Sequence, residues 1–244
     1  TNLPFDNTYS ADARIGDLDR DGDNDIFIPA QRSEPRLCLN DGTGKFKNAK
    51  QFIPKVSGDV IGVDAEFADV NNDGYPDIVL GNEGQNELLI NRGKKRPGFF
   101  YPVALPPARD FTQDIAIGDV DGDGDLDIVS ANLGIGIGKG EQNCLYLNDG
   151  KGNYSDATAQ CIPPWNDHSY QGLLVDFDGD GDLDLFFANN GEQNRLYIND
   201  GKGKFADATA KQLPKSEELN TCALAGDFDG DGDVDIITIC YNTP

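Results

Sequence analysis

Five acidic loops of nine residues recur along the chain, and their side chains are the ones best suited to chemistry. Each loop has oxygen-bearing side chains at positions 1, 3, 5 and 9 and a glycine at position 6, where a sharp turn is needed. Such crowded carboxylates repel one another unless a cation lies among them. A hard ion that takes six to eight oxygen ligands in flexible geometry fits best, so the pattern predicts about five Ca²⁺ ions. The loops are residues 17–25, 69–77, 119–127, 176–184 and 227–235.

The net charge of the chain comes from these loops. They contain 23 Asp residues, and the formal net charge of the 244-residue chain is -23. The other 20 acidic residues are matched by 20 Lys and Arg residues. The acidity is therefore local cation-binding chemistry, and it argues against a nucleic-acid partner, which requires a basic face. The apolar runs are too short to span a bilayer, so we expect no membrane insertion.

The elements that position the loops repeat with the same period. Loop starts are separated by 52, 50, 57 and 51 residues, and a period near 50 is typical of a propeller or solenoid. Between successive loops lies a short apolar run that ends in a turn, usually Asn-Asp-Gly, which predicts a tight hairpin. These segments are residues 36–42, 87–93, 144–150 and 195–201. Each repeat thus predicts four short antiparallel strands, with the acidic loop between the first two, which is a propeller blade.

We expect an all-β protein that forms a single β-propeller domain over residues 1–244, with about five four-stranded blades. The predicted units are residues 11–58, 59–110, 111–167, 168–218 and 219–244, plus an N-terminal strand within residues 1–10. The fifth unit supplies only two strands. Three interpretations remain open: a five-bladed ring with one thin blade, part of a seven-bladed propeller, or a blade completed by a strand from a neighbouring subunit.

The acidic loop and the Leu-Tyr-x-Asn-Asp-Gly-x-Gly-x-Phe segment recur together, and they resemble the FG-GAP/VCBS repeats of integrin α chains, some fungal lectins and secreted bacterial proteins. The resemblance covers nearly the whole chain and implies calcium that mainly stabilises the blades. It implies backbone carbonyl ligands from Asp23, Tyr75, Asp125, Asp182 and Asp233. It implies side-chain ligands from Asp17, Asp19, Asp21, Asp25, Asp69, Asn71, Asp73, Asp77, Asp119, Asp121, Asp123, Asp127, Asp176, Asp178, Asp180, Asp184, Asp227, Asp229, Asp231 and Asp235. Because Asn71 is neutral, we expect its loop to bind calcium most weakly.

The five cysteines lack the C-x-x-C spacing of metal or redox sites. Cys222 and Cys240 flank the fifth loop symmetrically, so we expect them to face each other and form a disulfide. Cys144 and Cys161 flank the last two strands of the third unit and are a second candidate pair, which leaves Cys38 as a buried thiol. The alternative is five reduced cysteines. Disulfides and dense calcium loops both favour an extracellular or cell-surface protein.

A second set of candidate residues lies at the blade ends opposite the calcium loops. Trp165, His168 and Tyr170 share one polar connection, and Gln193 and Asn194 belong to a Gln-Asn segment that recurs between blades. Aromatic rings and amides are typical of sugar sites. The alternatives are that Trp165 is a packing plug between blades and that the Gln-Asn segment is a turn that satisfies its own backbone.

The predicted function is a non-catalytic recognition or adhesion module for a glycan or an extracellular protein, stabilised by calcium. One alternative is a structural subunit of a surface layer or filament, assembled by strand exchange at the incomplete fifth blade. Another is a glycan-processing enzyme, which the single histidine, His168, disfavours. Asn153 begins the only N-x-S/T sequon and is a candidate for glycosylation.

Overall fold

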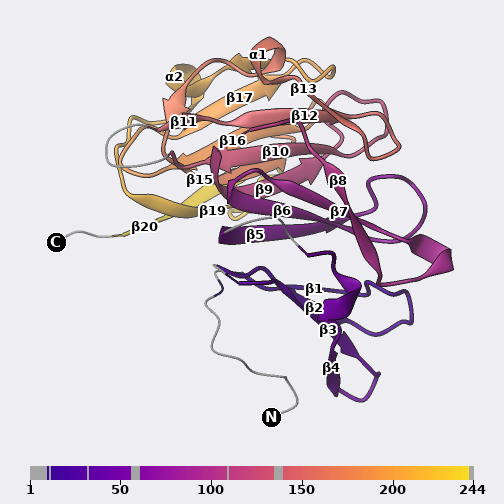
Figure 1. Ribbon diagram of the computed structural model, residues 1–244. Helices are drawn as coiled ribbons and strands as arrows, with labels where there is room; N and C mark the ends of the chain where they lie inside the picture. The colour runs from indigo at the N-terminus through magenta and orange to yellow at the C-terminus, as the bar shows by residue number, and fades with distance from the viewer. Residues whose placement is uncertain are drawn as a thin grey trace. The chain divides into compact units, whose positions relative to one another are not determined.

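The computed structural model describes residue 10 and residues 12–31, 33–55, 61–108, 110–134 and 140–241 (Figure 1). The chain divides into two compact units, residues 1–112 with 149–153 and residues 113–148 with 154–244. Both units are built from β-sheets, as predicted. In the described part of the chain, every helix falls short of the length and hydropathy that a bilayer crossing requires.

Two sets of four antiparallel strands, here called the first and second blades, form most of the first unit. The end of the second strand of the second blade also pairs with residues 110 and 111. The first blade contains β1 (Arg14–Gly16), β2 (Asp25–Ile28), β3 (Arg36–Asn40) and β4 (Phe46–Asn48). The second blade contains β5 (Ile61–Ala68), β6 (Asp77–Gly84), β7 (Glu87–Asn91) and β8 (Phe100–Ala104). Short 3-10 turns follow β4 and β7, namely η1 (Lys50–Phe52) and η2 (Gly93–Lys95).

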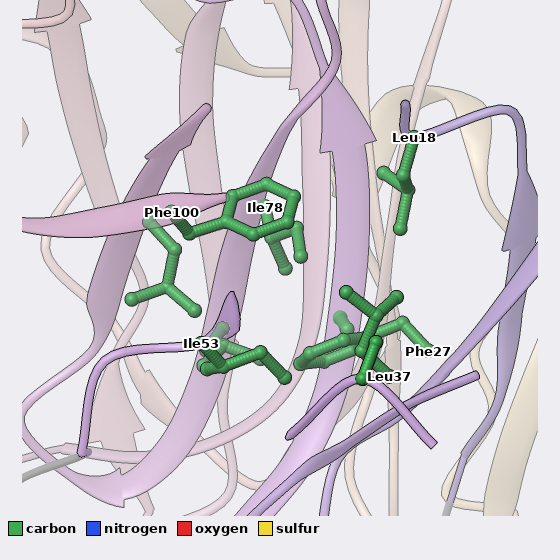
Figure 2. Close-up of a cluster of buried hydrophobic side chains, with 10 residues drawn as sticks. Leu18, Phe27, Leu37, Ile53, Ile78 and Phe100 are labelled. Atoms are coloured by element: carbon green, nitrogen blue, oxygen red, sulfur yellow. The ribbon is translucent and has the colours of Figure 1, made fainter. Parts of the chain in front are cut away.

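The core of the first unit lies between its two blades. Figure 2 shows Phe27 and Leu37 of the first blade near Ile78 and Phe100 of the second, together with Leu18 from the first acidic loop. All five side chains are buried. Each such burial stabilises the fold by about 1.5–3 kcal/mol, so blade-to-blade packing holds both acidic loops in place.

The second unit contains two further blades and a terminal hairpin. The third blade contains most of β9 (Asp110–Gly118), with β10 (Asp127–Asn132), β12 (Cys144–Asn148) and β13 (Tyr154–Asp156). The fourth contains β15 (Ser169–Val175), β16 (Asp184–Asn189), β17 (Arg195–Asn199) and β18 (Phe205–Asp207). The terminal hairpin contains β19 (Asn220–Gly226) and β20 (Asp235–Cys240). A small separate sheet pairs β11 (Glu141–Gln142) with β14 (Asn166–Asp167).

The predicted four strands per repeat are confirmed in four blades, and the fifth repeat supplies two strands, as expected. The predicted N-terminal strand lies outside the described residues, and the single-domain arrangement stays a prediction. One difference is that the Asp-Ala-Thr segments expected within the fourth strands start helical turns, α1 (Thr158–Cys161) and α2 (Thr209–Gln212). The side chains of Asp156 and Asp207 accept the Thr158 and Thr209 N–H groups at 2.9 Å, which turns the chain out of the strand.

The predicted disulfides are not present in the structure: no disulfide bond joins any of the cysteines, all of which lie in described segments. In the terminal hairpin, Cys222 lies opposite Ile239 and Cys240 lies opposite Asn220. At the loop end of the hairpin Gly226, not Asp227, pairs with Asp235, so the register is offset by one residue and the symmetric placement inferred from the sequence is wrong. In the third blade, Cys161 ends α1 and packs against the core, whereas Cys144 begins β12.

Candidate functional site

In four of the five acidic loops, the side chains at positions 1, 3 and 9 come together. One carboxylate oxygen from each residue lies within 4.8 Å of the others. These groups are Asp17, Asp19 and Asp25; Asp119, Asp121 and Asp127; Asp176, Asp178 and Asp184; and Asp227, Asp229 and Asp235. The second loop, with neutral Asn71 at position 3, forms no such group of carboxylates among the described residues. The position 5 carboxylates, such as Asp180, stand outside these groups.

The loop backbone curls as the glycine at position 6 predicted. These five glycines have φ between 88° and 96°, a region that other residues rarely adopt. Position 4 is left-handed as well, and in the first two loops it holds Arg20 (φ 61°) and Asn72 (φ 57°). This curl lets the position 1 carboxylate accept backbone N–H groups across the loop, as Asp176 does from Gly179 (2.8 Å) and Gly181 (3.0 Å).

The loops fit a bound calcium ion. Asp19 Oδ1 is buried and has no hydrogen-bond partner in the described segments. Burial is the main cause that raises the pKa of Asp19, and repulsion from the Asp21 carboxylate is the second. Burial and repulsion from Asp123 raise the pKa of Asp121 in the same way. A divalent cation would satisfy the unpaired oxygen and neutralise this repulsion. Since all donors are oxygens, the residues at positions 1, 3 and 9 would hold the ion, with positions 5 and 7 within the same loop.

The position 9 aspartate of each complete blade is a buried anchor. Asp25 accepts the Leu18 N–H at 3.0 Å and the Asn40 N–H at 2.9 Å. The corresponding pairs of bonds recur at Asp77, Asp127 and Asp184, with distances of 2.7–3.1 Å. Burial outweighs these donors and raises the pKa of Asp25 and Asp127 to about 6, and that of Asp77 to about 7. Burial also raises the pKa of Asp184.

Sequence reasoning missed the asparagine that begins each predicted turn. Asn199 donates its backbone N–H to Asp184 and its side-chain amide to the Leu183 carbonyl (3.0 Å) and to the Val120 carbonyl of the third blade (2.7 Å). Asn91 makes the same connection from the second blade to the Leu18 carbonyl (2.8 Å). The recurrence of this asparagine at the end of the apolar run in four repeats, at positions 40, 91, 148 and 199, was a usable signal. It ties the third strand to its own loop and to the loop of the preceding blade.

At the opposite blade ends, the Gln-Asn segments hydrogen-bond within the fold. Asn194 accepts the Asn189 N–H at 2.8 Å and the Asn220 amide at 3.1 Å. Gln193 donates to the Pro214 carbonyl (3.1 Å) and accepts the Ser216 N–H (3.2 Å). The same pattern recurs in the second and third blades. The structure therefore uses both residues to hold turns, which is the alternative that the sequence left open.

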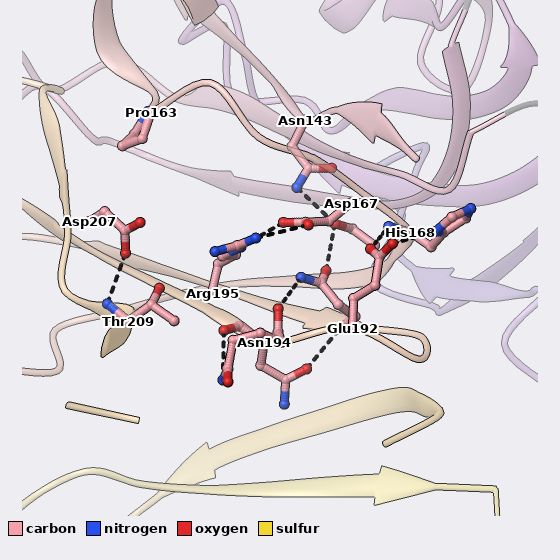
Figure 3. A network of polar contacts seen from close by, with 12 residues as sticks. Asn143, Pro163, Asp167, His168, Glu192, Asn194, Arg195, Asp207 and Thr209 are labelled. Carbon is pink, nitrogen blue, oxygen red and sulfur yellow. Dashed lines mark hydrogen bonds and ion pairs between the residues drawn. The ribbon is translucent and has the colours of Figure 1, made fainter. Parts of the chain in front are cut away.

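Trp165 packs on Arg195, which belongs with Asp167, His168 and Glu192 to a polar network at these same blade ends; Figure 3 shows the network. Trp165 is 46% exposed, and the Arg195 guanidinium packs 3.8 Å from the centroid of its ring. Asp167 holds Arg195 through two hydrogen bonds of 2.7 and 3.0 Å, so the cation beneath the ring is fixed in orientation. His168 lies beside them with Nδ1 3.1 Å from Glu192. The sequence did not predict the role of Arg195, since it is 28 residues from Asp167.

The two other candidates lie as follows. Tyr170 is half-buried in β15, two residues beyond His168. Asn153 is exposed in the turn between β12 and β13, as glycosylation would require, and its amide donates to Asp149 at 2.9 Å. Glycosylation of Asn153 stays a prediction.

Comparison with known proteins agrees with this geometry. The FG-GAP-like repeat model matches residues 17–80, 69–130, 135–187 and 176–238. Human integrin alpha-IIb is 33% identical over 94 residues, which cover 35% of this chain and 9% of the integrin. Mouse cartilage acidic protein 1 is 29% identical over 98 residues, which cover 38% of this chain and 15% of that protein.

A solved structure shares the fold. It is that of an Agrocybe aegerita lectin that specifically recognises non-reducing terminal N-acetylglucosamine, with a TM-score of 0.53 at 23% identity. The match covers 82% of this chain and 52% of the lectin chain, and the predicted β-propeller class is confirmed. The four matching repeats cover most of the chain, which therefore belongs to the FG-GAP-like repeat family.

Proposed function

We propose that the protein is an extracellular or cell-surface, non-catalytic recognition module for a glycan or a protein, with calcium bound in its acidic loops. The observation that carries this proposal is the exposed Trp165 ring fixed on Arg195. A flat, immobile aromatic ring can stack on the apolar face of a sugar or on an apolar side chain at little entropic cost.

Polar groups around the ring support the glycan interpretation. His168 and Glu192 lie beside Asp167, the residue that holds Arg195 (Figure 3). Together they offer donors and acceptors for sugar hydroxyls next to an aromatic surface. In this proposal, calcium acts at a distance, because it stabilises the blades that hold these residues.

A glycan array that includes N-acetylglucosamine-terminated oligosaccharides tests the proposal, followed by calorimetry of the best ligand. We expect Trp165→Ala to weaken binding by about tenfold or more, because stacking and burial of an aromatic ring are lost. Tyr241→Ala is the matched control, since Tyr241 is 74% exposed in the terminal hairpin. Equal binding by the parent and the Trp165 variant would contradict this site, and a blank array would favour a protein ligand.

A second candidate function is assembly, and the terminal hairpin favours it. Ile237 and Ile239 are 45% and 50% exposed, whereas their counterparts in the fourth blade, Phe186 and Ala188, are buried against the hairpin. We propose that this uncovered face receives the β1–β2 sheet of a second copy, where Ile15 is 65% exposed. Within each unit, the side chains that pack one blade against the next come from corresponding positions of the strands.

Light scattering across a concentration series tests assembly. Head-to-tail contacts should give growing oligomers that either Ile237→Asp or Ile15→Asp dissolves, while Lys215→Asp leaves them intact. A monomer at every concentration would contradict this candidate and favour closure within one chain.

A further inference from the structure

The turn between β7 and β8 differs in charge from the corresponding turns of the other complete blades. Those three turns begin Asn-Asp-Gly, with Asp41, Asp149 and Asp200. In the second blade, Arg92 replaces the aspartate, and Lys94, Lys95 and Arg96 follow. We call residues 92–96 the basic turn. Four cations within five residues are an anomaly on a chain with a net charge of -23.

The basic turn is held in one conformation. The Arg92 N–H donates to the Phe99 carbonyl (2.7 Å), and the Arg96 N–H donates to the Gly93 carbonyl (3.0 Å). The Phe99 ring stacks on Phe52 at 3.6 Å, and the Arg96 guanidinium lies 4.3 Å from the Phe99 centroid. A preorganised turn pays less conformational entropy when it binds a ligand, so its cations are suited to recognition.

The charges of the turn are available to a ligand. Arg92, Lys94, Lys95 and Arg96 are exposed, and none of them forms an ion pair with a carboxylate of the described chain. They line an open depression of about 580 Å³ together with Asp73 and Tyr101. Tyr101 is 41% exposed, and Arg92 lies 5.8 Å from its ring centroid. Four cations and an aromatic ring therefore converge on a single concave surface.

From this convergence, we propose that the basic turn binds a sulfated glycan. Guanidinium groups bind tetrahedral oxyanions through paired N–H bonds, and Lys ammonium groups add point charges. Tyr101 can stack on a sugar ring. A nucleic-acid backbone fits less well, because it would extend over a surface that is acidic elsewhere. The site lies in the first unit and is independent of the recognition site proposed at Trp165.

Calorimetry with a heparin octasaccharide, in buffer with calcium and low salt, tests the proposal on the full chain. We expect binding that Lys94→Ala with Lys95→Ala weakens by about tenfold, because two charge-assisted contacts are lost. Lys202→Ala with Lys204→Ala is the matched control, because it removes two cations from the corresponding turn of the fourth blade. The control should bind within about twofold of the parent, and higher salt should weaken binding.

Two further measurements separate a sulfated glycan from other anions. The desulfated octasaccharide should bind at least about tenfold more weakly than heparin, and Tyr101→Ala should weaken heparin binding without affecting inorganic polyphosphate. Absence of heparin binding, equal binding of the desulfated sugar, or equal loss in both lysine pairs would overturn the proposal. Tighter binding of a single-stranded oligonucleotide would also overturn it, in favour of nucleic-acid recognition.

Discussion

The fourth and fifth acidic loops differ only at position 8, where Leu183 of one corresponds to Val234 of the other. Their backbones curl in the same way, since Asp176 and Asp227 both accept the N–H groups of the glycines at positions 4 and 6. Position 9 nevertheless differs. Asp184 is buried, whereas Asp235 is partly exposed at the terminal hairpin.

The cause of this difference is the third strand. In the fourth blade, β17 brings the Asn199 N–H to Asp184, which also accepts the Phe177 N–H. In the described residues of the terminal hairpin, Asp235 accepts only the Phe228 N–H, at 3.1 Å. The loop sequence therefore sets the local curl, and the rest of the blade sets the burial and anchoring of the aspartate at position 9.

Calcium removal should give the largest loss of stability, and it should affect the fifth loop before the fourth. A site held at 100 times its Kd stabilises the fold by about 2.7 kcal/mol, and 1 kcal/mol shifts the Tm of a domain this size by about 2–4 °C. Chelation should thus lower the Tm by about 10 °C or more, and Mg²⁺ should restore little of it. Hydrogen exchange should show residues 227–240 opening before residues 176–189. An unchanged melting curve would contradict bound calcium.

The pH dependence of the calcium-free protein should follow the buried anchors. The pKa of Asp25 and Asp127 is about 6 and that of Asp77 about 7, all raised by burial from 3.8. At pH values between the unfolded pKa of 3.8 and the raised pKa of each group, the folded state binds more protons than the unfolded state. The free energy of unfolding therefore falls as pH rises through this range. We expect a loss of about 3 kcal/mol each for Asp25 and Asp127 and about 4 kcal/mol for Asp77, between about pH 4 and pH 7.

Urea unfolding in chelator at several pH values measures this dependence. Asp127→Asn should flatten it, and Asp235→Asn at the exposed hairpin should change it less. Stability that rises over the same pH range would contradict the buried-anchor interpretation. With calcium present the trend should reverse, because protons compete with the ion for the carboxylates.

The sequence predicted what is local and repeated. The spacing of the loops and turns predicted the strands correctly, because each repeat carries its own turn residues. It did not predict that Gly226 pairs with Asp235, which places Cys222 opposite Ile239, because the length of the loop does not by itself fix the register of the hairpin. The sequence also did not predict the pairing of Asp167 with Arg195, since such contacts depend on how neighbouring strands are placed.

The same substitution at the two last ligands should sharpen the comparison. With calcium present, Asp184→Asn and Asp235→Asn each remove one charged ligand. In the fourth blade, the introduced amide would also place its NH2 group against one of the two buried backbone N–H groups that Asp184 accepts. An unsatisfied buried N–H costs about 1–3 kcal/mol. We therefore expect Asp184→Asn to be more destabilising by about 2 kcal/mol in urea unfolding. Equal losses would show that strand three adds nothing to the anchoring of the loop.

The smallest effect is expected for the asparagine that ends the third strand, Asn199, which has no counterpart in the terminal hairpin. Asn199→Ala removes the amide that holds the Val120 and Leu183 carbonyls, and leaves both without that donor. Because water can partly replace the side chain, we expect a loss of about 1–2 kcal/mol in urea unfolding. Asn40→Ala should cost less, since both side-chain bonds of Asn40 lie near the surface: its amide donates to the Asn24 carbonyl and its oxygen accepts the Gly44 N–H, each at 3.2 Å. Exposed Asn166→Ala controls for the loss of an amide, with an expected change within about 0.5 kcal/mol. If all three variants lose the same stability, the link between blades through Asn199 contributes nothing, and the backbone N–H alone anchors the loop.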